Sequence, residues 1–229
     1  MEIVIETKKL TKVYGKGNTE VRALDGMDLV IERGEFTAIV GPSGSGKSTA
    51  LQLIGGLDHP TSGSVLLAGT AIQKMSGRQL SDFRRDHIGF IFQAYNLIPV
   101  LSAQENAEYI MLLQGRSKKE RHKLVHEILG AVGLQGLEHR RPAQLSGGQQ
   151  QRVAVARALA SKPDIILADE PTANLDSATG IALVDMMKQF NEEDKVTFVF
   201  STHDPRIMSR AKRLITLEDG KIVEDIRQN

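Results

Sequence analysis

The stretch Gly41–Ser48, "GPSGSGKS", constrains the fold of this chain more than any other feature. It follows the short apolar run Phe36–Val40, "FTAIV", and the residues after it have the pattern of a helix that ends at Gly55-Gly56. A strand, a glycine-rich loop and a helix in this order begin an α/β unit. We therefore expect an α/β fold organised around this loop.

The same stretch matches the pattern G-x-x-x-x-G-K-S/T of a phosphate-binding loop. Its glycines let successive backbone N–H groups converge on phosphate oxygens, and the helix that follows adds the positive end of its dipole. Lys47 can reach the β- and γ-phosphates, and the hydroxyl of Ser48 is placed to bind Mg²⁺. A flexible glycine and serine turn would not account for the Lys-Ser ending. The pattern predicts nucleotide binding by Gly41, Pro42, Ser43, Gly44, Ser45, Gly46, Lys47, Ser48 and Thr49.

Length and composition exclude several other kinds of protein. The 229 residues suffice for one large domain with a substantial core. The formal net charge of +1 gives no bulk electrostatic case for nucleic acid, and the absence of cysteine removes disulfides, thiolate zinc sites and cysteine nucleophiles. No apolar run approaches the ~20 residues that span a bilayer. We expect a soluble, cytoplasmic protein that reaches a membrane only through a partner.

The rest of the chain alternates between strand and helix patterns. The runs Asp164–Glu170, "DIILADE", and Val196–His203, "VTFVFSTH", have the composition of strands buried on both faces. Further on, "LITLEDGKIVED" predicts a hairpin that turns at Asp219-Gly220. Between Ala94 and Lys162 the pattern is mostly helical, so a helical insert interrupts the α/β core. One helix of the insert is expected to bury one apolar face, formed by Leu124, Ile128, Leu129 and Val132.

Polar side chains stand where the two buried strands end, which is where α/β sheets bind their ligands. We expect Asp169 to hold Mg²⁺, Glu170 to polarise the attacking water and His203 to bond the γ-phosphate. Without the upstream loop, the two acids could equally open a solvated loop. The other histidines, at no metal-ligand spacing, are interpreted as surface residues: His59, His87, His122, His126 and His139.

Two further residues gain meaning only from their position. Gln93 closes the strand pattern "IGFIFQ", where its amide could bind Mg²⁺ or water. Tyr14 could stack on a base if its ring is exposed. Taken alone, Gln93 would more simply be an amide at a strand end without a role, and Tyr14 would more simply be an aromatic side chain of the core.

A second glycine-rich stretch, Gln144–Ala160 or "QLSGGQQQRVAVARALA", leads into a helix. Its Ser146 could be an ordinary helix N-cap. Gly147 and Gly148, however, each cost about 0.5–1 kcal/mol of helix propensity relative to alanine, which favours a close approach of the backbone to some other group. Because the chain already has one phosphate-binding loop, we infer that this stretch meets a nucleotide held by another copy of the chain.

Taken together, these motifs make the chain similar to an ATP-binding cassette (ABC) ATPase over nearly its whole length. The resemblance rests on Tyr14, "GPSGSGKST", Gln93, "LSGGQQQR", "IILADEPTANLD" and "STHD" in this order. It implies a P-loop NTPase fold of the ABC ATPase type, with a mostly parallel core sheet, an antiparallel β portion and a helical insert. It further implies one domain over residues 1–229, in which residues 1–93 and 163–229 form the core and residues 94–162 the helical part.

The resemblance also implies the roles of the site residues. ATP and Mg²⁺ would be bound, with Tyr14 stacked on adenine, Lys47 on phosphate, and Ser48 and Gln93 in contact with the metal. Asp169 would hold the metal shell, Glu170 would be the general base and His203 the γ-phosphate sensor. Two copies would sandwich two ATP molecules, and the residues that act across this dimer would be Ser146, Gly147, Gly148, Gln149 and Asp176.

Stretches such as "RRDHIGFIFQAYNLIPVLSAQENAEYIMLLQG" make the chain resemble the lipoprotein-releasing and macrolide-exporting type of ABC ATPase, which works with an integral membrane subunit on the cytoplasmic face of the membrane. The same stretches are also similar to the cell-division member and to several peptide-resistance transporters. In that family the segment after Gln93 meets the membrane partner. Soluble ABC proteins of DNA repair or the ribosome are the alternative, but no long coiled coil separates Gly41 from Ser146 and only one cassette is present. A small-molecule kinase would lack "LSGGQ". No nucleic acid partner is expected.

Overall fold

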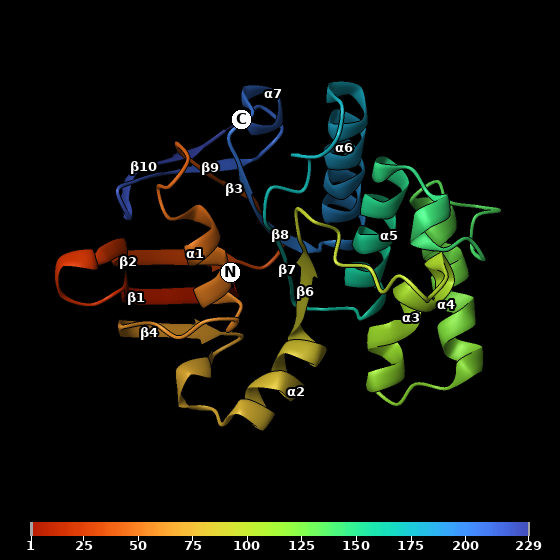
Figure 1. The fold of residues 1–229 in the computed structure, drawn as a ribbon, viewed down its shortest axis with the longest axis horizontal. Helices are drawn as coiled ribbons and strands as arrows, with labels where there is room; N and C mark the ends of the chain where they lie inside the picture. The colour runs from red at the N-terminus through yellow and green to blue at the C-terminus, as the bar shows by residue number, and fades with distance from the viewer. Residues whose placement is uncertain (1, 229) are drawn as a thin grey trace.

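The computed structural model describes residues 2–228 and distributes its strands over two sheets (Figure 1). The strands are β1 Ile3–Tyr14, β2 Val21–Glu32, β3 Phe36–Val40, β4 Ser62–Leu67, β5 Thr70–Ala71, β6 Ile88–Ile91, β7 Ile165–Ala168, β8 Thr197–Thr202, β9 Arg213–Glu218 and β10 Lys221–Arg227. The α-helices are α1 Lys47–Ile54, α2 Gly77–His87, α3 Ala103–Leu113, α4 Lys118–Ala131, α5 Gly147–Ala160, α6 Ser177–Asp194 and α7 Pro205–Met208. Short 3-10 turns occupy Gly17–Thr19, Ile72–Lys74 and Pro142–Gln144.

The larger sheet has the strand order β10-β9-β3-β8-β7-β6, and the smaller sheet the order β2-β1-β4-β5. All neighbours from β9 to β6 run parallel, whereas β10 pairs antiparallel with β9. The hairpin turns at Asp219 and Gly220, whose φ angles of +45° and +77° are those that a two-residue hairpin turn needs. The smaller sheet is antiparallel throughout. The predicted mostly parallel core with an antiparallel portion is therefore confirmed.

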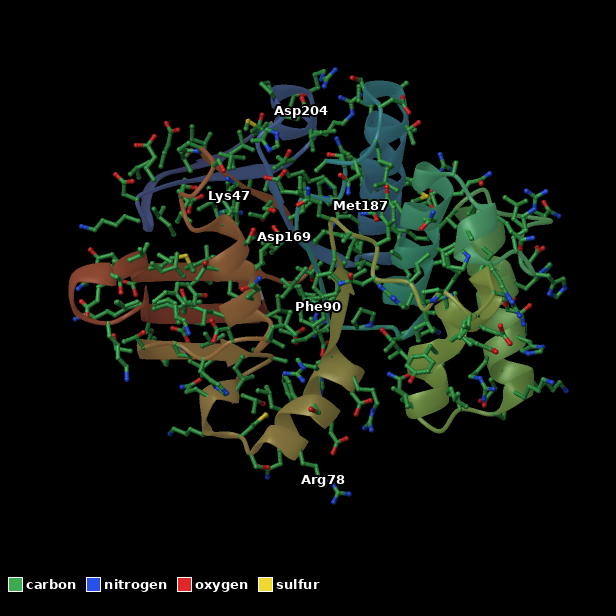
Figure 2. All side chains as sticks on the ribbon, viewed as in Figure 1. Lys47, Arg78, Phe90, Asp169, Met187 and Asp204 are labelled. Carbon is green, nitrogen blue, oxygen red and sulfur yellow. The ribbon has the colours of Figure 1, made fainter. Side chains whose placement is uncertain are left out.

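Helices cover the two faces of the parallel sheet unequally. Side chains alternate between the faces because a strand has a period of two residues. Ile39 and Val199 pack on the face that holds α1, whereas Phe198 packs on the face that holds α5 and α6. Figure 2 shows the result, with Lys47 of α1 on one side of the strands and Met187 of α6 on the other. The helices that follow the two glycine-rich stretches thus lie on opposite faces of one sheet.

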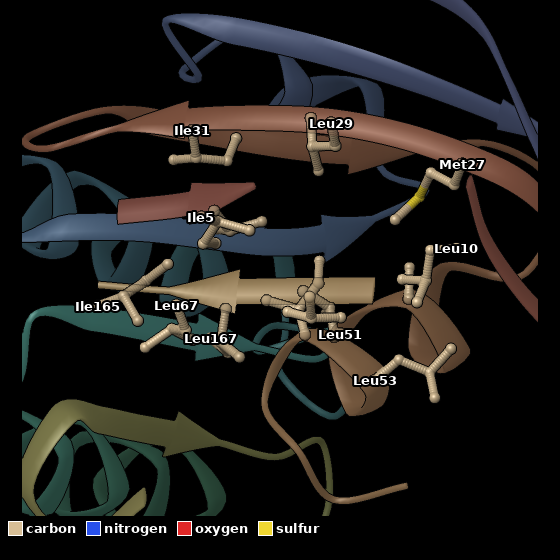
Figure 3. Packing of buried hydrophobic residues seen from close by; sticks show 14 of the residues in the cluster. Ile5, Leu10, Met27, Leu29, Ile31, Leu51, Leu53, Leu67, Ile165 and Leu167 are labelled. Carbon is tan, nitrogen blue, oxygen red and sulfur yellow. The ribbon is translucent and has the colours of Figure 1, made fainter. Parts of the chain in front are cut away.

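The smaller sheet closes the core on the α1 face. Ile5, Leu29 and Ile31 are almost completely buried, and Figure 3 shows them in one cluster with Leu51 of α1 and Leu167 of β7. Burying an aliphatic side chain contributes about 1.5–3 kcal/mol. This cluster therefore fixes α1, and with it the loop before α1, between the two sheets.

The helices α3, α4 and α5 surround a third cluster of apolar side chains. Leu129 and Val132 are buried in it as predicted, but Leu124 and Ile128 are only partly buried. Val125, which the sequence did not single out, is fully buried, and with Leu129 and Val132 it forms a face at spacings of four and three residues. Each helix starts at a serine whose hydroxyl accepts a hydrogen bond from an N–H three residues on: Ser102, Ser117 and Ser146. Within residues 2–228, none of the helices combines the length and the apolar character that crossing a membrane requires.

Candidate nucleotide-binding and hydrolysis site

The loop between β3 and α1 has glycine at points where the backbone has no room for a side chain. A Cβ on Gly41 would lie 2.1 Å from the carbonyl oxygen of Leu217, and one on Gly46 would lie 2.3 Å from that of Ala23. Gly44 has open space around it but a φ of +81°, a conformation that side chains disfavour. The neighbouring strands therefore hold the loop tightly on one side and leave its other side open.

Lys47, the first residue of α1, lies folded over this loop. It is 6% exposed, and its ammonium donates hydrogen bonds to the carbonyl oxygens of Gly41 at 2.9 Å and Pro42 at 2.8 Å. Ser45 is also buried, and among the described residues its Oγ has no hydrogen-bond partner. A buried hydroxyl without a partner costs free energy, which an incoming acceptor such as a phosphate oxygen would recover.

Ser48, Asp169 and Ser201 form one hydrogen-bonded group where the parallel strands end. The hydroxyl of Ser48 donates to Oδ1 of Asp169 at 2.9 Å, and the hydroxyl of Ser201 donates to the same oxygen at 2.7 Å. Because Ser48 uses its only hydrogen in this bond, its lone pairs stay free to face a cation. The described part of the chain holds no cluster of three His, Cys, Asp or Glu side chains suited to a metal. A metal here would thus rely on hydroxyl, amide and phosphate oxygens beside Asp169, a donor set that suits Mg²⁺.

Glu170 and His203 lie in contact at the same edge of the sheet. Nδ1 of His203 is 2.9 Å from Oε2 and 3.0 Å from Oε1 of Glu170, and the imidazole is 65% exposed. Glu170 has a φ of +45°, a left-handed conformation, and its N–H donates to Oγ of Ser201 at 2.8 Å. Such strain in a residue with a Cβ is typical of functional sites. Both groups can reach solvent, as a base and its partner acting on water must.

Tyr14 and Gln93 lie at strand ends, apart from this hydrogen-bonded group. The ring of Tyr14 is 39% exposed, its hydroxyl donates to Asp58 at 2.9 Å, and the ammonium of Lys12 lies 4.8 Å from the ring centroid. Burial and the neighbouring Asp58 raise the pKa of the Tyr14 phenol. Gln93 is exposed after β6, and its carbonyl accepts a hydrogen bond from Asn174 at 2.9 Å. The Gln93 side chain makes no hydrogen bond to Ser48 or Asp169 within residues 2–228.

Ser146 is the N-cap of α5, and it forms a capping box with Gln149. The Ser146 hydroxyl accepts from the N–H of Gln149 at 3.3 Å, and Oε1 of Gln149 accepts from the N–H of Ser146 at 2.9 Å. A Cβ on Gly147 would lie 2.8 Å from the Tyr95 hydroxyl, and one on Gly148 would lie 2.6 Å from Cγ2 of Thr179. Both atoms are the ends of side chains, which can move away, so these in-chain contacts do not by themselves account for the two glycines.

Asp176 caps the next helix, α6, and does not contact the phosphate-binding loop. Its carboxylate accepts from the N–H of Thr179 at 3.0 Å and from the Thr179 hydroxyl at 2.6 Å. Thr179 is also the residue that confines Gly148, so Asp176 and Gly148 are neighbours. No hydrogen bond between described residues joins positions 41–49 to positions 146–149. The structure thus assembles the predicted residues into two separate groups.

The interpretation of the remaining histidines needs one correction, at His87. Four of the five are exposed, but His87 is partly buried at the end of α2. Its Nδ1 lies 2.6 Å from Oδ2 of Asp164, and its ring stacks on Phe83 with centroids 4.2 Å apart. Ser201 was given no role from the sequence, although it opens the quoted stretch "STHD" and is a serine at the end of an apolar run.

Known proteins share this sequence and this fold. A family model described as "ABC transporter" matches residues 24–173. The macrolide export ATP-binding/permease protein MacB of Hyphomonas neptunium is 47% identical over 222 residues, which cover 97% of this chain and 34% of that protein. The lipoprotein-releasing system ATP-binding protein LolD of Legionella pneumophila is 43% identical over 221 residues, which cover 96% of this chain and 97% of that protein.

Solved structures of ATP-binding cassettes share the fold of this chain. The ATP-binding cassette MJ0796 of Methanocaldococcus jannaschii, solved as a dimer in a post-hydrolysis state bound to ADP and Pi, matches with a TM-score of 0.91 and 44% identity. The match covers 98% of this chain and 99% of that one. A second dimeric structure of MJ0796 also has a TM-score of 0.91, at 45% identity.

Proposed function

Because the chain belongs to the ABC transporter family and is an ATP-binding cassette with ATPase activity, we propose that two copies bind two ATP molecules between them, head to tail. Each ATP would lie between Gly41–Thr49 of one copy and Ser146–Gln149 of the other. One observation carries this proposal: α1 and α5 cover opposite faces of the same sheet, so one chain does not bring its two glycine-rich stretches together. The dimeric structures of MJ0796, one of them bound to ADP and Pi, support a dimer.

In this site, the phosphates would displace the carbonyl oxygens that now accept from the Lys47 ammonium. The buried Ser45 hydroxyl, which has no partner among the described residues, and backbone N–H groups of the loop would donate to phosphate oxygens. The ring of Tyr14 would stack on adenine. Ser48, Gln93 and Asp169 would hold Mg²⁺, which when bound neutralises charge on the phosphate oxygens.

Hydrolysis then requires a base beside the γ-phosphate. Glu170 would accept a proton from a water molecule as the water oxygen bonds to the γ-phosphorus and the bond to the bridging oxygen breaks, which gives ADP and phosphate. His203, in contact with Glu170 at 2.9 Å, would orient the water and the γ-phosphate. Asp176, next to the second glycine-rich stretch, would act across the dimer.

The proposed partner is an integral membrane transporter subunit, which would place the chain on the cytoplasmic face of the membrane. A groove of about 400 Å³ runs between α2 and α3, and its lining includes Phe92, Asn96 and Ile98 of the segment after Gln93. We propose that the membrane subunit docks in this groove. The MacB and LolD relatives favour a transport complex over a soluble role in DNA repair or on the ribosome.

The variant Ser146→Arg tests the head-to-tail site. Arginine at the second stretch should abolish ATP hydrolysis and ATP-dependent dimerisation, while the ATP affinity of the monomer, measured by calorimetry, stays within about twofold. The control is Ser117→Arg, since Ser117 forms the same capping box on α4 and its loss should cost the same ~1 kcal/mol of stability. A monomer that loses ATP affinity only in Ser146→Arg would show that the second stretch acts within its own chain.

A further inference from the structure

We propose that Ser201 is a positioning residue for hydrolysis, because its hydroxyl links the carboxylate of Asp169 to the backbone of Glu170. The inference rests on the proposed role of Glu170 as the base. Ser201 does not touch water or nucleotide in this proposal; it fixes the two residues that do. It opens the stretch "STHD", in which the sequence analysis assigns a role only to His203.

The hydroxyl of Ser201 is committed at both ends. Its hydrogen goes to Oδ1 of Asp169 at 2.7 Å, and its oxygen accepts the N–H of Glu170 at 2.8 Å. Ser201 is fully buried, so water cannot replace either bond. The parallel register explains the geometry, since Ala168 pairs with Phe200 and the next residues along the two strands are Asp169 and Ser201. The link therefore follows from the sheet itself.

The bond to Glu170 matters because that backbone is in an unfavourable conformation. At a φ of +45°, a residue with a Cβ needs its surroundings to hold it in place. The Glu170 N–H is held by Ser201, and its carbonyl oxygen accepts from the N–H of Ala173 at 3.2 Å. This turn aims the carboxylate at His203, 2.9 Å away. Without the Ser201 hydroxyl, the turn loses one of its two backbone restraints.

The nucleotide-binding residues depend on Ser201 much less. Lys47 and the loop are held by bonds to Gly41, Pro42 and Gly220, none of which involves β8. Asp169 also retains its bond from Ser48. Loss of the hydroxyl should therefore lower the rate of hydrolysis and leave ATP binding nearly unchanged.

Thr197, at the other end of β8, provides a matched control for the structural effect of removing a buried hydroxyl. Thr197 is also fully buried, and its Oγ1 accepts the N–H of Gly34 at 2.9 Å. The variant Thr197→Val removes a hydroxyl that bonds a backbone N–H, as Ser201→Ala does, but far from the ends of the strands where the site lies. Both variants should lower the thermal unfolding midpoint.

The experiment compares steady-state ATP hydrolysis and equilibrium binding of ATP for the full chain in three variants. In Ser201→Ala, kcat should fall roughly three- to tenfold, the factor that the lost hydrogen bond to the Glu170 N–H represents, while KM and the Kd for ATP stay within about twofold. Ser201→Thr keeps the hydroxyl and should recover most of kcat. Thr197→Val should keep the wild-type kcat.

The proposal is overturned if kcat of Ser201→Ala stays within twofold of wild type, if Thr197→Val lowers kcat equally, or if the Kd for ATP rises as much as kcat falls. A threonine variant as slow as the alanine variant would also contradict it. Glu170→Gln, measured alongside, separates the proposed base from the proposed positioning residue. If Glu170→Gln is inactive and Ser201→Ala keeps the wild-type kcat, Glu170 remains the base and only the positioning role of Ser201 is wrong.

Discussion

Replacing Glu170 with glutamine tests the chemistry of the site most directly, because the amide keeps the shape of the side chain and cannot take a proton. Loss of a general base lowers the rate by about 10²–10⁴, which corresponds to about 2.7–5.5 kcal/mol of activation free energy. The fold should hardly respond. The hydrogen bond to Ser201 comes from the backbone N–H of residue 170, so the substitution keeps it. The side-chain amide oxygen of the new glutamine can still accept from His203. We expect the free energy of unfolding to change by about 0.5 kcal/mol or less.

The assay follows phosphate release at saturating ATP and Mg²⁺, together with the molar mass of the protein in solution with and without ATP. Glu170→Gln should bind ATP with wild-type affinity and elute as a dimer only when ATP is present, because bound ATP is no longer consumed. Glu127→Gln, the same change on the exposed surface of α4, should retain full activity. More than about a tenth of the wild-type rate in Glu170→Gln would refute the assignment of the base, and a monomer at saturating ATP would count against the head-to-tail dimer.

Two further variants probe the loop and the opposite end of the sheet. Gly41→Ala would place a Cβ 2.1 Å from the carbonyl oxygen of Leu217, so the loop must shift and the Kd for ATP should rise by at least about tenfold in a calorimetric titration. Burial raises the pKa of Asp164, but the hydrogen bonds from His87 and Arg33 outweigh it and hold that pKa below its usual range. A lowered carboxylate pKa stabilises the fold above the unfolded pKa, and this contribution disappears as the pH falls through the folded pKa. Asp164→Asn should therefore be less stable than wild type in urea at neutral pH, and the difference should shrink as the pH falls below about 4.

The parts of the fold that the sequence predicts are those with a strong local pattern. The strand, loop and helix around Gly41–Ser48 and the hairpin at Asp219-Gly220 follow from glycine positions and uninterrupted apolar runs. By contrast, β2, α2 and α6 were not singled out. Their apolar residues are interleaved with charged ones, as in "VRALDGMDLVIE", and the packing that selects them involves segments distant in sequence.

The residues of the candidate site also differ in how far local sequence predicts them. Roles for Lys47, Ser48 and Glu170 can be predicted from motifs because each motif is contiguous and its chemistry depends on residue type. Ser201 cannot be found this way, since its role depends on the register between β7 and β8. The partner of His87 is hidden for a similar reason, because Asp164 lies 77 positions away and meets it only through the pairing of β6 with β7.

For the second glycine-rich stretch, the fold gives a stronger argument for a dimer than the glycine pattern does. Two glycines at the start of α5 indicate a close approach, and the structure supplies one within the chain, from Tyr95 and Thr179. The glycines by themselves therefore do not establish a second copy. The stronger physical argument is the position of the sheet, which lies between α5 and α1. No hydrogen bond between described residues joins the start of α5 to the phosphate-binding loop of the same chain. In the proposed arrangement a second copy brings Ser146 to the phosphates at Lys47, so the dimer proposal rests on the fold and not on the glycine pattern.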